Sequence, residues 1–337
     1  MQMKLPIQFP IIQAPMAGGI TDAKFVSTIS NYGCLGAIAG GNLSIEALQE
    51  EIQAVKQLTE KPFMVNLFVL DHHYKTIEQF ETVKTHLNEI EKELGIQTTY
   101  EYQTYPTTEQ YVELCIQEAV PIVSFTFGLP DIQLIQRLKK NGIITIGTAN
   151  SVEEAIRIEE AGMDFVVCQG YEAGGHRGGF LNQPSIGLFA LLPQVKQSVS
   201  IPIIAAGGIV DNKTIQAANI LGADYFQMGT RFLNTYESIA SDIHKNAISQ
   251  AIETATVETD KITGKTARGI RNDLIDQLKK YDVPNYPVMH QMTKPIRSTS
   301  KAQNNSNYMS MWAGQNIRHM KTMHLKDVLN LVTESFK

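Results

Sequence analysis

Residues 203–230 read IIAAGGIVDNKTIQAANILGADYFQMGT, and this stretch decides the fold. It contains two short apolar runs, Ile203–Ala206 and Tyr225–Met228, with a segment of helical spacing between them, Asn212–Leu221. Apolar runs without alternation are typical of parallel strands that are buried on both faces. A crossover helix is the usual link between two such strands. The stretch therefore predicts a β–α–β unit of a parallel sheet.

The same pattern recurs from the N-terminus onward. Segments such as Ser44–Leu58, Asp131–Lys140 and Ser151–Ala161 have helical spacing and open on capping residues. Eight strands are predicted: Ile11–Gln13, Leu35–Ile38, Phe63–Asn66, Ile122–Phe125, Ile143–Ile146, Phe165–Cys168, Ile203–Ala206 and Tyr225–Met228. Eight β-then-α units in about 235 residues match a (β/α)₈ TIM barrel in count and length.

An open, doubly wound sheet would also alternate strands and helices. Such sheets commonly carry Gly-x-Gly-x-x-Gly after the first strand, whereas this chain has Ala-Pro-Met-Ala-Gly-Gly at residues 14–19. We therefore favour the barrel. The third unit is long, and we expect a helix at Thr76–Leu94 followed by a strand and a second helix.

The barrel rhythm stops near residue 235, which divides the chain into three predicted parts. Residues 1–235 form the barrel, and residues 236–310 form a smaller, mainly helical lid or substrate domain inserted before the end of the chain. In that domain we expect helices near Ile239–Ala251 and Asp273–Lys280. Residues 311–337 should pack back on the barrel through a final helix, His324–Ser335.

Composition excludes several classes of function. A hydrophobic fraction of 43% with 19% charged residues is ordinary for a globular enzyme. The net charge of −5, without a basic run, gives no general attraction for nucleic acid or for anionic membranes. We find neither a secretory signal nor an apolar run long enough to span a bilayer, so we expect a cytoplasmic protein. The sequence leaves a homo-oligomer open.

Cysteine and histidine usage argues against a metal centre. The three cysteines, Cys34, Cys115 and Cys168, are scattered, and we expect buried thiols rather than disulfides or metal ligands. The adjacent pair His72-His73 has no carboxylate placed to complete a site, because neighbouring residues rarely bind one ion together. We therefore predict that no metal is bound.

The turns after the seventh and eighth strands look like a phosphate site. Glycine allows the backbone to approach an anion closely, and consecutive N–H groups can point at it. These two turns are the usual phosphate-binding place in a TIM barrel. Helix N-termini expected near Asp211 and Thr235 would add partial positive charge. The predicted contacts are Gly207, Gly208, Gly229 and Thr230.

Two amides at the ends of apolar strands, Asn66 and Gln169, are candidates to bind a flat heterocycle. A buried amide needs partners, and each of these side chains offers a donor and an acceptor. The alternative is a local hydrogen bond to a loop.

His176 is the best catalytic candidate, because the glycines around it free the backbone to aim the ring into the barrel mouth. An imidazole with an ordinary pKa near 6.5 suits proton transfer or stabilisation of an anionic substrate. We expect Arg177 to be a loop charge and the other seven histidines to be inert. Trp312 could wall the pocket, and it otherwise serves packing.

The segment 169–178, QGYEAGGHRG, resembles the glycine–histidine loop of nitronate monooxygenases, formerly called 2-nitropropane dioxygenases. The resemblance extends over nearly the whole chain. It includes PIIQAPM at 10–16, VN at 65–66, AAGGI at 205–209, QMGT at 227–230, ARG at 267–269 and MWAGQ at 311–315.

This resemblance implies FMN held at Asn66, Gln169, Gly174, Gly208 and Gln227–Thr230, with His176 at the substrate. It also implies oxidation of alkyl nitronates, such as propionate 3-nitronate, by O₂. Related FMN-dependent enoyl-acyl-carrier-protein reductases and NADH:quinone reductases carry a similar loop. An NAD(P)H-dependent reductase is therefore the alternative, and a flavin-binding module without catalysis is a third. Gln169, Arg177 and the segment 312–315 favour the monooxygenase.

Overall fold

The computed structural model describes residues 3–70, 80–99 and 103–337. In these ranges eight parallel strands form one sheet in the order β1-β9-β8-β6-β5-β4-β3-β2. A parallel bridge between Ile12 and Leu35 joins the two ends of this order and closes the barrel. The strands are β1 Ile11–Gln13, β2 Gly36–Ala39, β3 Phe63–Phe68, β4 Ile122–Thr126, β5 Ile144–Ala149, β6 Phe165–Gln169, β8 Ile203–Ala206 and β9 Tyr225–Met228. The predicted TIM barrel is confirmed.

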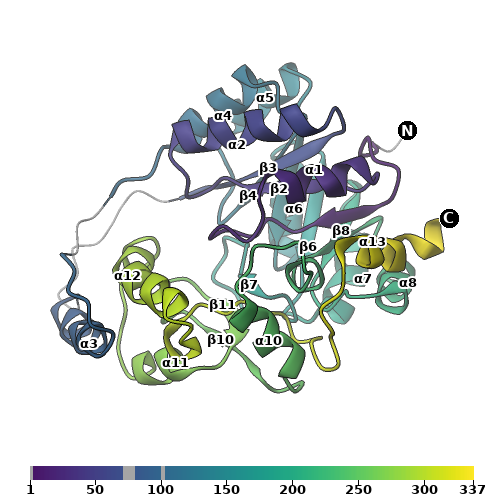
Figure 1. Cartoon of the computed structure of the whole chain (residues 1–337). Helices are drawn as coiled ribbons and strands as arrows, with labels where there is room; N and C mark the ends of the chain where they lie inside the picture. The colour runs from purple at the N-terminus through teal and green to yellow at the C-terminus, as the bar shows by residue number, and fades with distance from the viewer. Residues whose placement is uncertain (1–2, 71–79, 100–102) are drawn as a thin grey trace.

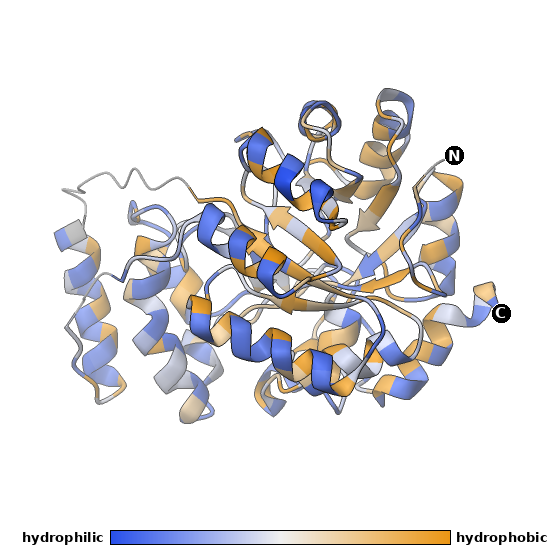
Figure 2. Cartoon of the chain, turned by 90° about the horizontal axis from the view of Figure 1, so that it is seen from above, coloured by the Kyte–Doolittle hydropathy of each residue, from blue (hydrophilic) through white to orange (hydrophobic). Residues whose placement is uncertain are grey.

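Helices surround the barrel because each carries one apolar face. Figure 2 shows apolar strands at the centre, while the helices place their hydrophilic faces outward. The outer helices are α1 Ala23–Asn31, α2 Ile45–Leu58, α4 Thr108–Gln117, α5 Ile132–Lys140, α6 Val152–Glu160, α7 Leu188–Ser198, α8 Asn212–Ile220, α9 Thr230–Leu233 and α13 Leu325–Thr333, with a 3₁₀ turn, η2 Glu334–Phe336, at the end. The predicted caps are confirmed, since Ser44, Asp131, Ser151 and Asp211 each accept a backbone N–H of the following turn.

A second, smaller unit has its own core and lies beside the carboxyl mouth of the barrel (Figure 1). A short strand of the loop after β6 joins it, in an antiparallel sheet of order β10-β11-β7. The elements of this unit are α3 Phe80–Glu93, β7 Gly175–His176, α10 Asp242–Gln250, β10 Thr256–Thr259, β11 Ala267–Ile270, α11 Asp273–Leu278, α12 Val288–Ala302 and η1 Ser306–Tyr308.

Helix α3 lies outside the predicted lid range of 236–310, yet it packs on that unit rather than on the barrel. Its apolar face, Val83, Leu87 and Ile90, shares a core with Leu274 and Met292. The predicted boundary at residue 235 therefore does not separate the two cores, because the third unit contributes a helix to the smaller one. The strand expected between this helix and α4 is absent from the described residues 96–99 and 103–107.

Three other local predictions need correction. Strand β3 runs two residues further than predicted, so Asn66 lies within the strand rather than at its end. His176 lies in the short strand β7 and not in a free loop, because Ala267 of β11 pairs with it. The helix after β9 starts at Thr230 rather than near Thr235.

In the described ranges, none of the helices has the length and apolarity that a membrane crossing requires.

Candidate active site

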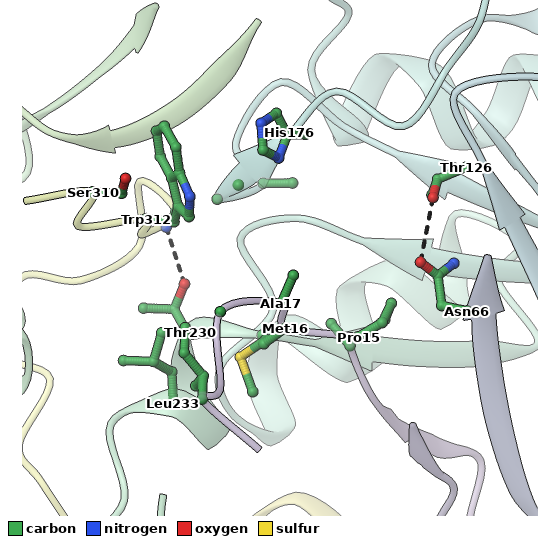
Figure 3. Close-up of a pocket in the computed structure, with 18 of the residues that line it drawn as sticks. Pro15, Met16, Ala17, Asn66, Thr126, His176, Thr230, Leu233, Ser310 and Trp312 are labelled. Carbon is green, nitrogen blue, oxygen red and sulfur yellow. Dashed lines mark hydrogen bonds between the residues drawn. The ribbon is translucent and has the colours of Figure 1, made fainter. Parts of the chain in front are cut away.

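A cavity of about 590 Å³ opens at the carboxyl ends of the barrel strands, between the barrel and α12 (Figure 3). All of the residues predicted to carry the site line it, namely Asn66, Gln169, Gly174, His176, Gly207, Gly208, Gln227, Met228, Gly229 and Thr230. The structure thus brings together residues from β3, β6, β7, β8, β9 and the turns that follow them.

The turns after β8 and β9 form one wall of the cavity. Gly208 takes a left-handed φ of 70°, which favours glycine. In the part of the chain that the structure describes, the backbone N–H groups of Gly208, Gly229 and Thr230 donate to no protein acceptor. Met228 also lines the cavity, although it belongs to the barrel core. These turns therefore offer backbone donors to a ligand.

The helix N-termini predicted near Asp211 and Thr235 add less positive charge to these turns than expected. The Asp211 carboxylate accepts the Thr214 N–H at 2.9 Å, so α8 already has a negative charge at its N-terminus. Thr235 is buried after the end of α9, and its hydroxyl donates to Phe232 O at 2.8 Å. The donors of this wall are therefore the turn amides and not the predicted helix ends.

The segment around Gly314 closes the same wall from the C-terminal part of the chain. Gly314 N donates to Thr230 Oγ1 at 3.0 Å (Figure 3), and the Asn316 side chain donates to Gly208 O at 2.8 Å. A Cβ atom on Gly174 would lie 2.5 Å from Gly314 N, so the loop after β6 needs a glycine there to approach this segment. The absence of a side chain at residue 174 thus serves packing as well as access to the cavity.

Asn66 lies in β3 with its amide held against β4 (Figure 3). Its Nδ2 donates to Ser124 Oγ at 2.9 Å, and Thr126 Oγ1 donates to its Oδ1 at 3.3 Å. The amide is buried, and each of these contacts uses only part of its hydrogen-bonding capacity. Its Nδ2 also lies 3.4 Å from Ser124 O, so both N–H groups have partners within the protein, and one lone pair of Oδ1 stays available to a ligand in the cavity.

Gln169 anchors the loop that carries His176. Its Oε1 accepts hydrogen bonds from Asn150 Nδ2 at 2.9 Å and from Gly178 N at 2.8 Å. Its Nε2 donates to the backbone oxygen of His176 at 3.0 Å. Gln169 thus uses most of its hydrogen-bonding capacity within the protein, as the alternative interpretation of a local hydrogen bond to a loop predicted. One N–H of Nε2 is left for a ligand.

Arg177 is buried and its side chain holds the loop in shape, so the prediction that it is a loop charge is wrong. Its guanidinium donates to Gly170 O at 2.7 Å and to Ala173 O, and its Nε lies 3.3 Å from Glu258. Burial lowers the pKa of Arg177 to about 10, and the charge stays in place at cellular pH. These contacts of Arg177 fix the shape of the loop on the side away from the cavity.

His176 projects into the cavity from β7, in contact with three aromatic rings. The centroid of its ring lies 5.6 Å from that of Phe127 and 5.9 Å from that of Tyr286. Trp312, 5.4 Å away, lies beside it in Figure 3. Its Nε2 lies 2.8 Å from Thr263 Oγ1. The ring is therefore held by partners from both the barrel and the smaller unit, and Trp312 does wall the pocket.

The imidazole of His176 is neutral at cellular pH. Burial is the largest cause, and the charges of Lys265, Arg297 and Arg177 add to it, so that the pKa of His176 falls to about 3. A neutral ring offers a lone pair that can accept a proton. It does not offer a positive charge, so the lowered pKa of His176 disfavours the predicted stabilisation of an anionic substrate and leaves the role of an acceptor.

The positive charge of the cavity lies instead on α12, which the sequence interpretation missed. Lys294, Arg297 and Lys301 carry this charge. All three line the cavity, and their spacing places them along one helix face, together with His290 one turn earlier. That spacing was visible in the sequence and could have marked the face. Among the lining residues that the structure describes, none is Asp or Glu.

Arg297 is fixed within this wall. Its guanidinium donates to His290 O at 2.8 Å, Ser310 Oγ at 3.2 Å and Thr293 Oγ1 at 3.1 Å. Within the described residues no carboxylate pairs with it, and burial lowers its pKa to about 10. A held guanidinium without an acidic partner favours an anionic ligand.

Two of the histidines expected to be inert also line the cavity. His244 is buried, and its Nε2 lies 3.1 Å from Trp312 O. Burial lowers the pKa of His244 to about 4 and that of His290 to about 2. Both rings are therefore neutral at cellular pH and form part of the cavity wall. The three cysteines are buried as expected.

The described residues contain no cluster of three or more metal-ligating side chains. His72 and His73, considered above as metal ligands, lie outside the described residues.

Comparison with known proteins defines the class of this barrel. The family model described as nitronate monooxygenase matches residues 1–335. A probable nitronate monooxygenase of Staphylococcus haemolyticus is 44% identical, over 99% of this chain and 95% of the relative. Among solved structures, nitroalkane oxidase from Streptomyces ansochromogenes has a TM-score of 0.92 at 32% identity, covering 97% of this chain and 95% of that one. FabK from Thermotoga maritima has a TM-score of 0.77 at 28% identity, covering 98% and 93%.

The fold and these matches define an oxidoreductase built on a TIM barrel. More particularly, the chain belongs to the nitronate monooxygenase family.

Proposed function

We propose that this protein oxidises alkyl nitronates with O₂, using FMN bound in the barrel mouth and His176 at the substrate. The observation that carries the proposal is the cavity itself. It combines backbone donors on one wall, a neutral histidine, and cationic side chains without an acidic partner among the described residues. A nitronate is an anion, and such a wall attracts one.

The residues present fit FMN. The unpartnered N–H groups of Gly208, Gly229 and Thr230 suit its phosphate, which needs several donors at close range. Asn66, and the N–H left on Gln169, suit the carbonyl and N–H edge of its ring. Gln227 and Gly207 line the same region, and Gly174 allows the loop to approach it. When bound, FMN supplies the electron transfer between substrate and O₂.

The chain's own residues bind and orient the substrate. Phe127, Tyr286 and Trp312 pack around the His176 ring and give it an apolar setting. The lone pair of His176 can accept a proton or a hydrogen bond at the reacting end of the substrate. Arg297 and Lys294 lie on α12, where a second negative charge, as in propionate 3-nitronate, would be neutralised.

One observation favours a second candidate, an NAD(P)H-dependent flavin reductase. FabK from Thermotoga maritima shares the whole fold, although its TM-score of 0.77 is lower than the 0.92 of the nitroalkane oxidase. The same cationic wall would also accept a nucleotide phosphate.

Anaerobic reduction of the bound flavin distinguishes the two functions. The purified protein, reconstituted with FMN, is mixed with propionate 3-nitronate, NADH or NADPH while the flavin absorbance is followed. We expect bleaching by the nitronate, and O₂ consumption in air without a nicotinamide nucleotide. Bleaching by NADH or NADPH alone would replace the proposed function with the reductase. A protein that cannot be loaded with FMN would contradict both.

A further inference from the structure

Thr263 is the hydrogen-bond partner of the catalytic histidine, and it comes from the smaller unit. Its Oγ1 lies 2.8 Å from His176 Nε2, and its side chain is only 1% exposed. It lies between β10 and β11, in the connection that approaches β7. A buried partner of an active-site imidazole determines which ring nitrogen carries the hydrogen.

The direction of the hydrogen bonds follows from a second contact of the same hydroxyl. Thr263 Oγ1 lies 3.2 Å from the backbone oxygen of Lys265, and a carbonyl can only accept. The hydroxyl has a single hydrogen. If it donates to Lys265 O, it must accept from His176 Nε2–H, and all three groups are satisfied. In the reverse arrangement Lys265 O loses this donor, and a polar group left without its partner in a buried setting is unfavourable.

We propose that Thr263 is a positioning residue that holds His176 as the Nε2–H tautomer and leaves Nδ1 as the proton acceptor in the cavity. Nδ1 has no hydrogen-bond partner in the part of the chain that the structure describes, and the ring lines the cavity. Only a protonated form of the substrate, the nitroalkane or the nitronic acid, has a proton to give: its C–H or O–H bond breaks, Nδ1 takes the proton, the ring becomes an imidazolium, and the substrate keeps the electron pair as the nitronate. The Nε2–H bond to Thr263 is retained throughout that transfer.

The surrounding backbone keeps Thr263 in this place. Gly264 N donates to Asp260 O at 2.7 Å, and Tyr286 N donates to Gly264 O at 3.1 Å. On the other side, Arg177 N donates to Thr266 O at 2.9 Å, directly after His176. The loop with Thr263 is thus fixed by its own backbone contacts, and the bond from Arg177 ties it to the strand with His176, which favours one ring orientation.

The tautomer matters because the ring is neutral. Burial and the charge of Lys265 keep the pKa of His176 far below its ordinary value. A neutral imidazole exists in two forms, and only the form with a bare nitrogen toward the substrate can act as a base. Loss of the Thr263 acceptor would let the other form compete.

Thr263→Val tests the proposal, because it removes the hydroxyl and keeps the shape, and Thr263→Ser is the matched control that keeps the hydroxyl. The FMN-loaded protein is labelled with ¹⁵N-histidine, and two-bond ¹H–¹⁵N spectra are recorded at neutral pH, with His176→Asn to assign the signals. We expect a protonated Nε2 and a bare Nδ1 in the wild type and in the Ser variant. The Val variant should show a mixture of tautomers. A wild-type ring protonated on Nδ1, or unchanged nitrogen shifts in Thr263→Val, would overturn the proposal.

The kinetic readout rests on the proposed function, whereas the spectra do not. We expect Thr263→Val to lose roughly 10- to 100-fold in kcat with 3-nitropropionate, the protonated form of propionate 3-nitronate, which is the range typical of outer-shell partners. Its flavin content and KM should stay near the wild type, and Thr263→Ser should restore turnover. Unchanged kcat in the Val variant would contradict the positioning role. If the wild type oxidises no nitronate, the proposed function fails, and the spectra still decide the tautomer.

Discussion

The cavity has two walls of different construction. The wall at the ends of β8 and β9 presents backbone N–H groups of Gly208, Gly229 and Thr230. The opposite wall, from the smaller unit, presents side chains of α12 such as Lys294 and Arg297. Backbone donors are fixed by the fold and suit a constant group such as a phosphate. Side chains change by single substitutions, so the smaller unit is where substrate selectivity can vary.

The largest effect is expected from a charge placed on the backbone wall. Gly208→Asp puts a carboxylate and a side chain at a φ of 70° against the proposed phosphate. Two like charges about 4 Å apart repel by about 4 kcal/mol at an effective dielectric constant of about 20, roughly a 10³-fold loss of FMN affinity. The flavin-to-protein ratio, read from absorbance after desalting, measures it.

Gly142→Asp is the matched control, since Gly142 has a φ of 74°, is exposed and ends α5 away from the cavity. It shares the backbone strain but should keep the flavin. Equal flavin loss in both variants would show that strain, and not the phosphate, explains the first result.

His176→Asn should act on turnover and leave the backbone wall intact. We expect FMN to be retained while kcat with propionate 3-nitronate falls by roughly 10²–10⁴, the range of general acid–base catalysis. His319→Asn is the control, because His319 is exposed at a φ of 66°, which asparagine accepts. Loss of flavin from the His176→Asn variant would contradict the proposal that the backbone wall holds FMN independently of His176.

Arg297→Met should change selectivity more than catalysis. A charge-assisted hydrogen bond contributes about 1.5–3 kcal/mol, so KM for propionate 3-nitronate should rise roughly 10-fold or more. Ethyl nitronate has no second charge, and its KM should change little. Arg297→Lys retains the charge and should recover part of the preference. Parallel losses for both substrates would mean that Arg297 supports the shape of α12 rather than the substrate.

The smallest expected effect is that of pH. The pKa of His176 is lowered to about 3. The ring is therefore fully deprotonated at pH values well below 6.5, and it gains a proton only as the pH falls toward 3. We expect kcat/KM to show no histidine step between about pH 5 and 8, where an unperturbed imidazole would titrate. Stopped-flow pH jumps with preformed nitronate measure this before the nitronate is protonated. A break near pH 6.5 that disappears in His176→Asn would contradict it.

The barrel was predictable because each strand is defined locally. Ile203–Ala206 and Tyr225–Met228 match the observed strands, since a continuous apolar run has few other places in a soluble fold. The same holds for the residues around the cavity that follow barrel strands, because strand order places them at one end. Their roles toward FMN remain predictions.

What the sequence did not reveal depends on contacts between distant segments. Thr263 lies 87 residues from the histidine that it contacts, in a connection without any motif. Arg177 looked like a solvated charge, yet Glu258 and two loop carbonyls surround it. Such pairings follow from how the smaller unit docks on the barrel, which local spacing does not encode.

The shared core of α3 and the smaller unit has a consequence for synthesis of the chain. The apolar face of α3, with Val83 and Leu87, leaves the ribosome long before its partners Leu274, Met292 and Ile296. Domains tend to fold as they are completed, so the barrel strands can assemble while this helix still lacks its neighbours. During that interval α3 is an amphipathic segment with an uncovered face. A chaperone that recognises apolar helices would find it there, before α12 is complete.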